Sequence, residues 1–349
     1  MHVNVAIVGL DRISASLGLA LKRYQEKPNA KHTFTIIGRD TRTSAMKDAH
    51  KAGAIDNFNR ALLKATDNAD LIIFNSPPGS FEEDFTRLGS TLKPGAVVLD
   101  MSPLKQPAIA WAAANFPKNQ GGDPLAYVVG FTPVVNVGGL YAGSMEAEAA
   151  AADIFDEGDV IITPDASCPS EAIQLAEDVA RLIGGEARFM DPQEHDGLIA
   201  ATEGLPALLG VGLFHALEQS EGWTDLRRMV NPALAMATQN LRHQSVTDMV
   251  SLFTSNREHL ARHLEGLIGV LDQMRDLLVD EEDVDHEKLS IFVSRVKDKW
   301  ETWDVKRHSG KWEAAERPPL EAMPGPLGGL GNFLGGRRRS SDDEDDGNS

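Results

Sequence analysis

The stretch Ile7–Leu21, IVGLDRISASLGLAL, follows directly on an apolar run that begins at Val3. An apolar strand that ends in a glycine and leads into a helix is typical of the start of a dinucleotide-binding unit, whose usual fingerprint is Gly-x-Gly-x-x-Gly. Gly9 occupies the first glycine position here, but Asp11 and Ser14 occupy the second and third. The stretch therefore indicates the fold, while nucleotide binding has to be argued residue by residue.

Asp11 is the more serious departure, because a carboxylate about 4 Å from a phosphate charge costs roughly 4 kcal/mol at an effective dielectric of 20. Arg12 offsets this cost by pairing with the carboxylate or the phosphate, and the helix that starts near Ile13 presents free N–H groups. Asp11 can also turn outward as the N-cap and leave these amides to a ligand. We therefore place Gly9, Leu10, Asp11, Arg12 and Ile13 at a candidate cofactor site. A helix cap without any ligand is the alternative.

The second predicted strand ends in IIGRD, Ile36–Asp40. An acidic residue at this place takes the ribose hydroxyls of NAD, whereas a nearby arginine favours the 2′-phosphate of NADP. Asp40 is flanked here by Arg39 and Arg42. The sequence therefore predicts NAD or NADP as the cofactor, and the two arginines favour NADP.

A further apolar run, Leu71–Phe74, ends in the turn NSPPG. Ligands of such folds bind beyond the carboxyl ends of the strands, so Ser76 and Pro77 are predicted to cover the cofactor. A plain strand-to-helix turn is the alternative.

Short apolar runs and helix-like segments alternate from residue 1 to about 190, which predicts an α/β Rossmann-type domain with a parallel sheet covered by helices. The expected strands are Val3–Val8, Thr33–Ile37, Leu71–Phe74, Ala96–Leu99, Tyr127–Val129, Val160–Thr163 and Ala187–Met190. Residues 191–310 are expected to form an all-α helical domain, with periodic segments Ile199–Leu217, Pro232–Leu241 and Val250–Leu278. Its wide apolar faces favour a homodimer over a self-contained bundle. Residues 311–349, rich in Pro, Gly and charge, are expected to be a disordered tail.

Composition limits the function classes. The 349 residues carry a formal net charge of −18, which argues against a nucleic-acid surface. The sequence shows neither an apolar run of about 18 residues nor a secretory leader, so we expect no membrane partner and a cytoplasmic location. The single cysteine, Cys168, fits a reducing compartment. The pair His259 and His263 is interpreted as part of a solvated helix face, because no third metal ligand follows in a zinc-binding order.

Several segments together resemble the prephenate and arogenate dehydrogenases of tyrosine biosynthesis. They are VLDMSPLK (Val98–Lys105), similar to the family's Asp-x-x-Ser-x-x-Lys segment; VGFTP (Val129–Pro133), similar to Gly-x-His-Pro; FMDPQEHDGLIAATEGLP (Phe189–Pro206), similar to a His-Asp helix followed by Ser-His-Leu-Pro-His; LRRMVNP (Leu226–Pro232); and SNRE (Ser255–Glu258). The resemblance covers most of residues 1 to about 305, in the same order and spacing.

The resemblance implies oxidative decarboxylation, in which hydride leaves a ring carbon for the nicotinamide and loss of carbon dioxide gives an aromatic ring. It also implies roles for two retained residues. Ser102 takes the place of an active-site serine near the nicotinamide, and Arg228 that of an arginine that grips a substrate carboxylate. The substrate is thus expected to be a small carboxylic acid, and no metal is expected.

The departures from the family bear on catalysis. Its catalytic histidine falls on Thr132, which cannot hold a proton near neutral pH. The two histidines of Ser-His-Leu-Pro-His fall on Gly204 and Ala207, and its serine falls on Glu203. His195 is the nearest surviving histidine, so it is a candidate acid or base, and Glu203 is expected to favour an amine-bearing substrate such as arogenate. Alternatives are a member redirected to another small acid and an inactive binding or regulatory protein.

Overall fold

The structure, a computed structural model, describes residues 1–141, 144–279 and 286–312. Within these residues eight strands form a single sheet in the order β3-β2-β1-β4-β5-β6-β7-β8. The strands are β1 (His2–Val8), β2 (Thr33–Arg39), β3 (Asn57–Phe58), β4 (Leu71–Phe74), β5 (Val97–Asp100), β6 (Tyr127–Pro133), β7 (Asp159–Pro164) and β8 (Glu186–Phe189). All seven predicted strands are confirmed. The two-residue β3 is too short for its pattern to be seen in the sequence.

The sheet is parallel from β3 to β6, but β7 pairs with β6 in the antiparallel direction and β8 follows β7 in parallel. The predicted parallel sheet is therefore confirmed from β3 to β6, and the antiparallel pairing of β6 with β7 is a departure from it. A parallel neighbour needs a crossover that returns along the sheet, usually a long helix. The connection after β6 instead contains only the short helices α6 (Val137–Leu140) and η1 (Ala147–Ala149) among its described residues, and β7 runs back beside β6.

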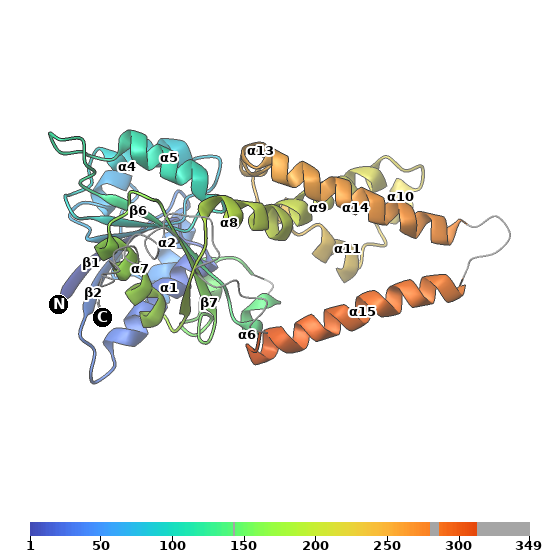
Figure 1. The fold of residues 1–349 in the computed structure, drawn as a ribbon, viewed down its shortest axis with the longest axis horizontal. Helices are drawn as coiled ribbons and strands as arrows, with labels where there is room; N and C mark the ends of the chain where they lie inside the picture. The colour runs from blue at the N-terminus through green and yellow to red at the C-terminus, as the bar shows by residue number, and fades with distance from the viewer. Residues whose placement is uncertain (142–143, 280–285, 313–349) are drawn as a thin grey trace, which may run out of the picture. The chain divides into compact units, whose positions relative to one another are not determined.

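Helices cover both faces of the sheet, as Figure 1 shows. Alternate residues of β1 point to opposite faces, so that Val5 and Ile7 belong to one buried cluster while Ala6 and Val8 belong to the other. Burial on both faces is why the strands are continuous apolar runs. The first cluster lies under α1 (Arg12–Gln25), α2 (Thr43–Lys51) and α7 (Ser170–Leu182), and the second under α3 (Leu62–Ala65), α4 (Phe81–Gly89) and α5 (Lys105–Asn115).

Beyond β8 the described residues form helices alone. They are α8 (Pro192–Ile199), the π-helical turn η2 (Ala200–Gly204), α9 (Leu205–Glu218), α10 (Trp223–Leu226), α11 (Pro232–Ala237), α12 (Asn240–His243), α13 (Val246–Ser255), α14 (Arg257–Leu278) and α15 (His286–Ser309). The α/β-then-α fold class is thereby confirmed. Helices α8, η2 and α9 run on without a break, and Pro206, which has no N–H to donate, accounts for the wide turn at η2.

The continuous helix Pro192–Glu218 is long and apolar enough, by length and composition alone, to cross a membrane, in contrast to the expectation from the sequence. Its first turns are tied to the sheet by buried polar contacts, described below, while 22% of its apolar window is buried in the protein. Contacts divide the chain into a unit Met1–Thr302 and a second that begins at Trp303, of which only the end of α15 and the three residues after it are described. The domain boundary expected at residue 190 stays a prediction, and nearly all of the tail expected at 311–349 lies outside the described residues.

Candidate active site

The turn after β1 requires glycine. Gly9 has a φ of +86°, and a Cβ atom built on it would lie 1.9 Å from the backbone oxygen of Asn75, the residue after β4. The ends of β1 and β4 approach so closely that no side chain fits between them. This is the point where the strand order reverses, at which open α/β sheets bind their ligands.

Asp11 and Ser14, which replace two fingerprint glycines, form a reciprocal helix cap. The Ser14 amide donates to Asp11 Oδ1 at 2.8 Å, and the Asp11 amide donates to Ser14 Oγ at 3.0 Å. Ser14 Oγ also donates to the backbone oxygen of Gly9 at 2.7 Å. The predicted N-cap role of Asp11 is confirmed, and the two departures are a matched pair that fixes the start of α1.

The expectation that this cap leaves the helix amides to a ligand is wrong for Arg12. The Arg12 amide donates to the backbone oxygen of Met145 at 2.9 Å. The Arg12 guanidinium is buried and donates through Nη1 to the backbone oxygen of Gly139 at 3.1 Å. Both acceptors come from the connection between β6 and β7. Ile13, the next residue of α1, stays half-buried.

Asp40 lies at the end of β2, as predicted, and is buried. Its Oδ2 accepts from the Leu10 amide at 2.7 Å, and its Oδ1 accepts from the Arg42 amide at 2.7 Å. The Arg42 guanidinium pairs with Glu146 at 2.7 Å and also contacts Asp40 Oδ1 at 3.4 Å. Asp40 is therefore fixed in place beside the turn of β1.

Arg39 and Ser76 share one partner that the sequence analysis missed. The Arg39 guanidinium pairs with the Asp84 carboxylate at 3.1 Å, and Ser76 Oγ donates to the same carboxylate at 2.5 Å. All three side chains are buried, whereas Pro77 is exposed. The structure therefore brings Ser76 to the predicted edge but directs Arg39 away from Arg42 and into a structural ion pair.

The turn after β5 holds a buried lysine. The Lys105 ammonium donates to the backbone oxygens of Asp100 at 2.8 Å and Ser102 at 2.6 Å, and lies 3.6 Å from Asp100 Oδ2. Burial lowers the pKa of Lys105 and raises the pKa of Asp100. Ser102 Oγ donates to the backbone oxygen of Leu104 at 3.0 Å, so its hydroxyl proton is used within the turn. Only one residue separates Asp100 from Ser102, one fewer than in the family segment.

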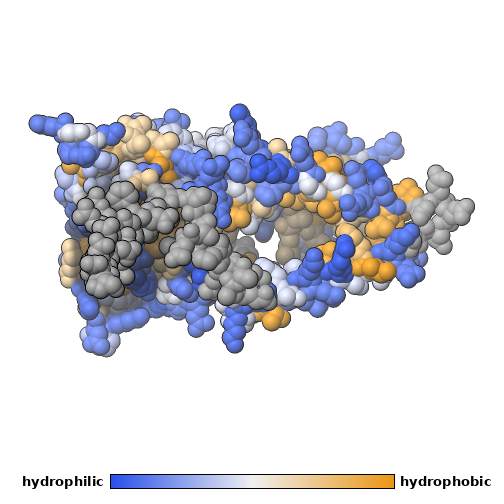
Figure 2. Space-filling model, in the orientation of Figure 1, coloured by the Kyte–Doolittle hydropathy of each residue, from blue (hydrophilic) through white to orange (hydrophobic). Residues whose placement is uncertain are grey.

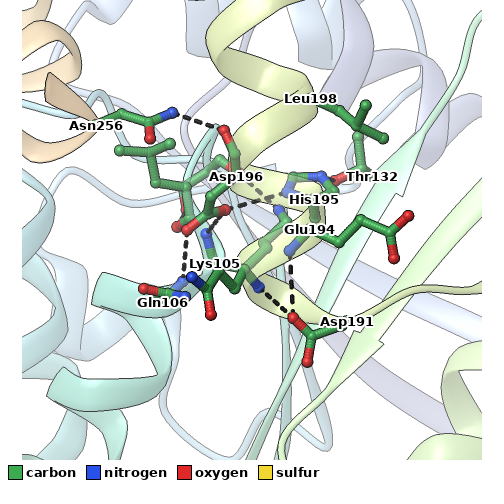
Figure 3. A network of polar contacts seen from close by, with 12 residues as sticks. Lys105, Gln106, Thr132, Asp191, Glu194, His195, Asp196, Leu198 and Asn256 are labelled. Carbon is green, nitrogen blue, oxygen red and sulfur yellow. Dashed lines mark hydrogen bonds and ion pairs between the residues drawn. The ribbon is translucent and has the colours of Figure 1, made fainter. Parts of the chain in front are cut away.

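A chain of polar contacts joins β6 to α8 (Figure 3). Thr132 Oγ1 lies 2.9 Å from His195 Nε2, and His195 Nδ1 lies 3.2 Å from Asp196 Oδ1. Because a carboxylate only accepts, Nδ1 carries the proton and Nε2 accepts from the Thr132 hydroxyl. Burial lowers the pKa of His195, which keeps its ring neutral at physiological pH. A neutral imidazole can take up a proton through Thr132.

The Asp196 carboxylate holds this chain in place. Its two oxygens accept from the amides of Lys105 at 2.7 Å and Gln106 at 3.0 Å, at the start of α5. The Asp196 backbone oxygen accepts from Asn256 Nδ2 at 2.7 Å. Asp196 therefore caps α5 and fixes the His195 ring at once, a double role that the sequence did not reveal.

The remaining candidates on the helical side differ in position. Glu203 lies on the π-helical turn η2 and keeps accessible surface, yet the surrounding protein raises its pKa by desolvation, with Asp11 adding a smaller repulsion. Gly204 and Ala207 are buried. The Arg228 side chain is exposed after α10, and it pairs with no residue of the described ranges. Glu203 therefore lies within electrostatic reach of Lys105 and Asp11, whereas the Arg228 side chain forms no contact with the other candidates among the described residues.

The structure also bears on His259, on Cys168 and on metal binding. His259 is partly buried against Gly197, so the expected solvated face is wrong for this residue. Burial raises the pKa of Cys168 to about 12, which makes it an unreactive thiol. Within the described residues no three His, Cys, Asp or Glu side chains are grouped as metal ligands.

Comparison with known proteins identifies relatives of this chain in sequence and in fold. Residues 17–189 match the model of the prephenate dehydrogenase nucleotide-binding domain. A cyclohexadienyl dehydrogenase of Zymomonas mobilis is 26% identical over 212 residues, which cover 60% of this chain and 66% of that protein. A prephenate dehydrogenase of Bacillus subtilis is 23% identical over 309 residues, covering 82% of this chain and 72% of that protein. The first alignment thus spans just under two thirds of its relative.

Solved structures share the fold over nearly the whole described chain. A prephenate dehydrogenase of Aquifex aeolicus, solved with hydroxyphenyl propionate and NAD⁺, superposes with a TM-score of 0.68 at 22% identity and covers 86% of this chain and 97% of its own. An arogenate dehydrogenase of Synechocystis gives 0.59 at 17% identity, covering 86% and 99%. The nucleotide-binding domain, residues 17–189, therefore belongs to the prephenate dehydrogenase family, and solved prephenate and arogenate dehydrogenases share the fold over 86% of the chain.

Proposed function

We propose that this protein is an NAD-dependent dehydrogenase that oxidatively decarboxylates arogenate or prephenate in tyrosine biosynthesis. The observation that carries the proposal is the contact chain Thr132–His195–Asp196 at the carboxyl end of β6. It supplies a proton acceptor at the position where the family has its catalytic histidine. The complex of the Aquifex relative with NAD⁺ and hydroxyphenyl propionate supports the same substrate class.

In this mechanism the bound coenzyme supplies the hydride acceptor. Thr132 Oγ1 takes the proton of the substrate ring hydroxyl while its own proton passes to His195 Nε2, so that the ring carbon can release hydride as its oxygen becomes a carbonyl. Loss of carbon dioxide returns an electron pair to that oxygen, and the proton held by His195 goes back to it through Thr132. The ring is then a phenol, and the enzyme groups have regained their first state.

The coenzyme is expected to be NAD, although Arg39 and Arg42 favoured NADP in the sequence. Arg39 is committed to Asp84, and the buried Asp40 carboxylate, fixed by the Leu10 amide, would face a 2′-phosphate. We expect NADH to bind about tenfold more tightly than NADPH in a fluorescence titration, equivalent to roughly 1.4 kcal/mol. Asp40→Asn should abolish this difference, while Asp67→Asn, at an exposed carboxylate, should preserve it. Tighter binding of NADPH by the wild-type protein would contradict the assignment.

The amine-bearing substrate is favoured by Glu203. Its carboxylate, where the family has a serine, attracts an ammonium group and repels a second carboxylate, so we expect kcat/KM for arogenate to exceed that for prephenate by about tenfold. Glu203→Ser should remove the preference, whereas Glu221→Ser, at an exposed position, should not. Because the pKa of Glu203 is raised, the preference should also weaken as the pH falls and the carboxyl is protonated. An unchanged substrate ratio in Glu203→Ser would reject this role.

Two other functions have supporting observations. The contact of the Arg12 amide with Met145 favours an inactive relative that serves as a binding or regulatory protein. The loss of the family histidine at Thr132 favours a dehydrogenase redirected to another small acid. Failure of NADH and NADPH to bind would support the first of these, and coenzyme binding without turnover of either substrate would support the second.

We further propose that the protein acts in the cytoplasm as a homodimer. Large apolar side chains are exposed on its helices, among them Leu198, Leu209, Leu213 and Phe214 on the helix from α8 to α9 and Ile268 and Leu271 on α14. Figure 2 shows such side chains as orange patches over the helical half. Apolar surface of this extent is commonly covered by a partner, and a second copy presents the same surface.

A further inference from the structure

The residues Ser144–Ala149, called the strap here, occupy the position expected for coenzyme phosphate. Arg12 is the first residue of α1, and its amide is one of the donors that a helix N-terminus offers to a phosphate. That amide donates to the backbone oxygen of Met145 at 2.9 Å, and Asp11 and Glu146 form an isolated antiparallel bridge. The strap therefore fills this position with a neutral carbonyl of the chain itself.

Among the contacts of the described residues, the strap supplies the one partner of this turn's backbone amides that comes from outside the β1–α1–β2 unit. The Leu10 amide donates to Asp40, and the amides of Asp11 and Ser14 donate within the helix cap. These three contacts are built into the fold of the unit. The contact of Arg12 with Met145 can be exchanged for a ligand without unfolding any strand or helix of the nucleotide-binding domain.

The strap has a firm end and a weak end. Ala147 is buried in the core cluster beside α1 and α2, and the Ala151 amide just beyond it donates to Ser16 Oγ at 2.9 Å. At the other end Glu146 pairs with Arg42, but the two side chains are 48% and 47% exposed. Exposed ion pairs contribute only about 0.2–1 kcal/mol, so the end that covers Arg12 is held weakly.

Arg12 is a buried cation that forms no ion pair with the described residues. The residue is 6% exposed, and among the described residues its Nη1 donates only to the Gly139 carbonyl and its buried Nε has no partner. A guanidinium removed from water without a counter-charge is costly, and a bound anion relieves that cost. Arg12 thus donates to the backbone oxygens of Met145 and Gly139, and a phosphate would bind to Arg12 more strongly than these neutral oxygens do.

We propose that the strap is a displaceable stand-in for the coenzyme pyrophosphate. When the coenzyme binds, its pyrophosphate replaces the Met145 carbonyl on the Arg12 amide and gives the Arg12 guanidinium its counter-charge, while Glu146 leaves Arg42. The inference rests on the proposed dehydrogenase function, because it assumes that a dinucleotide enters this turn. It also explains how a chain without the second and third glycines admits one.

Hydrogen exchange measured by mass spectrometry on the full chain tests the proposal. Saturating NADH should raise the exchange rate of peptides that cover 144–151 at least severalfold, and millimolar inorganic pyrophosphate should do so in part. Glu146→Gln should raise the same exchange rate without coenzyme and lower the Kd for NADH about two- to fivefold, because the Glu146–Arg42 ion pair is lost. Glu148→Gln, an exposed change in the same strap, should alter neither quantity.

The results separate this inference from the proposed function. NADH binding with unchanged or slower exchange of 144–151 overturns the strap and leaves the dehydrogenase standing. NADH binding to Glu146→Gln but not to the wild-type protein would show that the strap blocks this turn, and would overturn its displacement by the coenzyme. If neither the wild-type protein nor any variant binds NADH, the dehydrogenase proposal and the displacement step both fail. Equal exchange rates of 144–151 in Glu146→Gln and Glu148→Gln independently reject the role of the Glu146–Arg42 ion pair.

Discussion

Thr132→Val should lower kcat for the preferred substrate by about 10²–10⁴-fold, the usual value of general-base assistance. Valine has the shape of threonine without the hydroxyl, so the proton path to His195 Nε2, now 2.9 Å from Thr132 Oγ1, is broken while the packing is kept. The pH profile of kcat/KM is the second measurement. Because burial lowers the pKa of His195, the wild-type rate should stay level through neutral pH and fall only below the ordinary histidine range. Thr132→Val should lose this acidic limb.

Two variants test whether the effect belongs to the proton path. Thr132→Ser keeps a hydroxyl and should retain most of the rate and the acidic limb. His195→Gln keeps a polar side chain at the buried site but cannot take up a proton, so it should match Thr132→Val in kcat with KM changed much less. If Thr132→Val keeps both the wild-type rate and its acidic limb, the contact of Thr132 with His195 is structural and the base lies elsewhere.

The fold was predictable because its strands are buried on both faces. A run such as Leu71–Phe74 is apolar at every position, and a glycine or a turn follows, so the strands along the chain and the helices between them could be expected from pattern alone. The reversal of β7 could not be expected. It depends on how the connection after β6 folds, and neither α6 nor η1 is long enough to give a helical period.

The candidate site was predictable where one residue serves one purpose, and not where two segments meet. Asp11 followed by Ser14 carries the signature of a helix cap, so the N-cap role could be stated from the sequence. Nothing in the sequence links Met145 to Arg12, because a backbone carbonyl leaves no mark in residue identity. The carboxylate of Asp84 is likewise an ordinary acid in the first turn of a helix until the structure brings Arg39 to it.

Lys105→Met should lower the free energy of unfolding by about 3–5 kcal/mol, the usual result of leaving one member of a buried ion pair without its partner. Lys105 is fully buried, and its side chain passes so close to β6 that a Cβ atom on Gly130 would lie 3.0 Å from Lys105 Cδ. Methionine fills a similar volume, so the loss is mainly electrostatic: Asp100 keeps its buried carboxylate, and the backbone oxygens of Asp100 and Ser102 lose their donor. Urea denaturation followed by tryptophan fluorescence measures the change.

A double-mutant cycle separates charge from packing. Asp100→Asn keeps an acceptor for the Ser102 amide but removes the negative charge, so Asp100→Asn combined with Lys105→Met should recover part of the stability that Lys105→Met loses. The loss in unfolding free energy caused by Lys105→Met should also shrink as the pH falls. Because the pKa of Asp100 is raised, this carboxyl takes up a proton at a higher pH than an ordinary aspartate, and its uncompensated charge then disappears. Lys118→Met, at an exposed lysine beyond α5, should change stability by less than about 0.5 kcal/mol. Equal losses for Lys105→Met at neutral and acidic pH, with no recovery in the double variant, would show that the lysine acts only through its packing and its two carbonyl contacts.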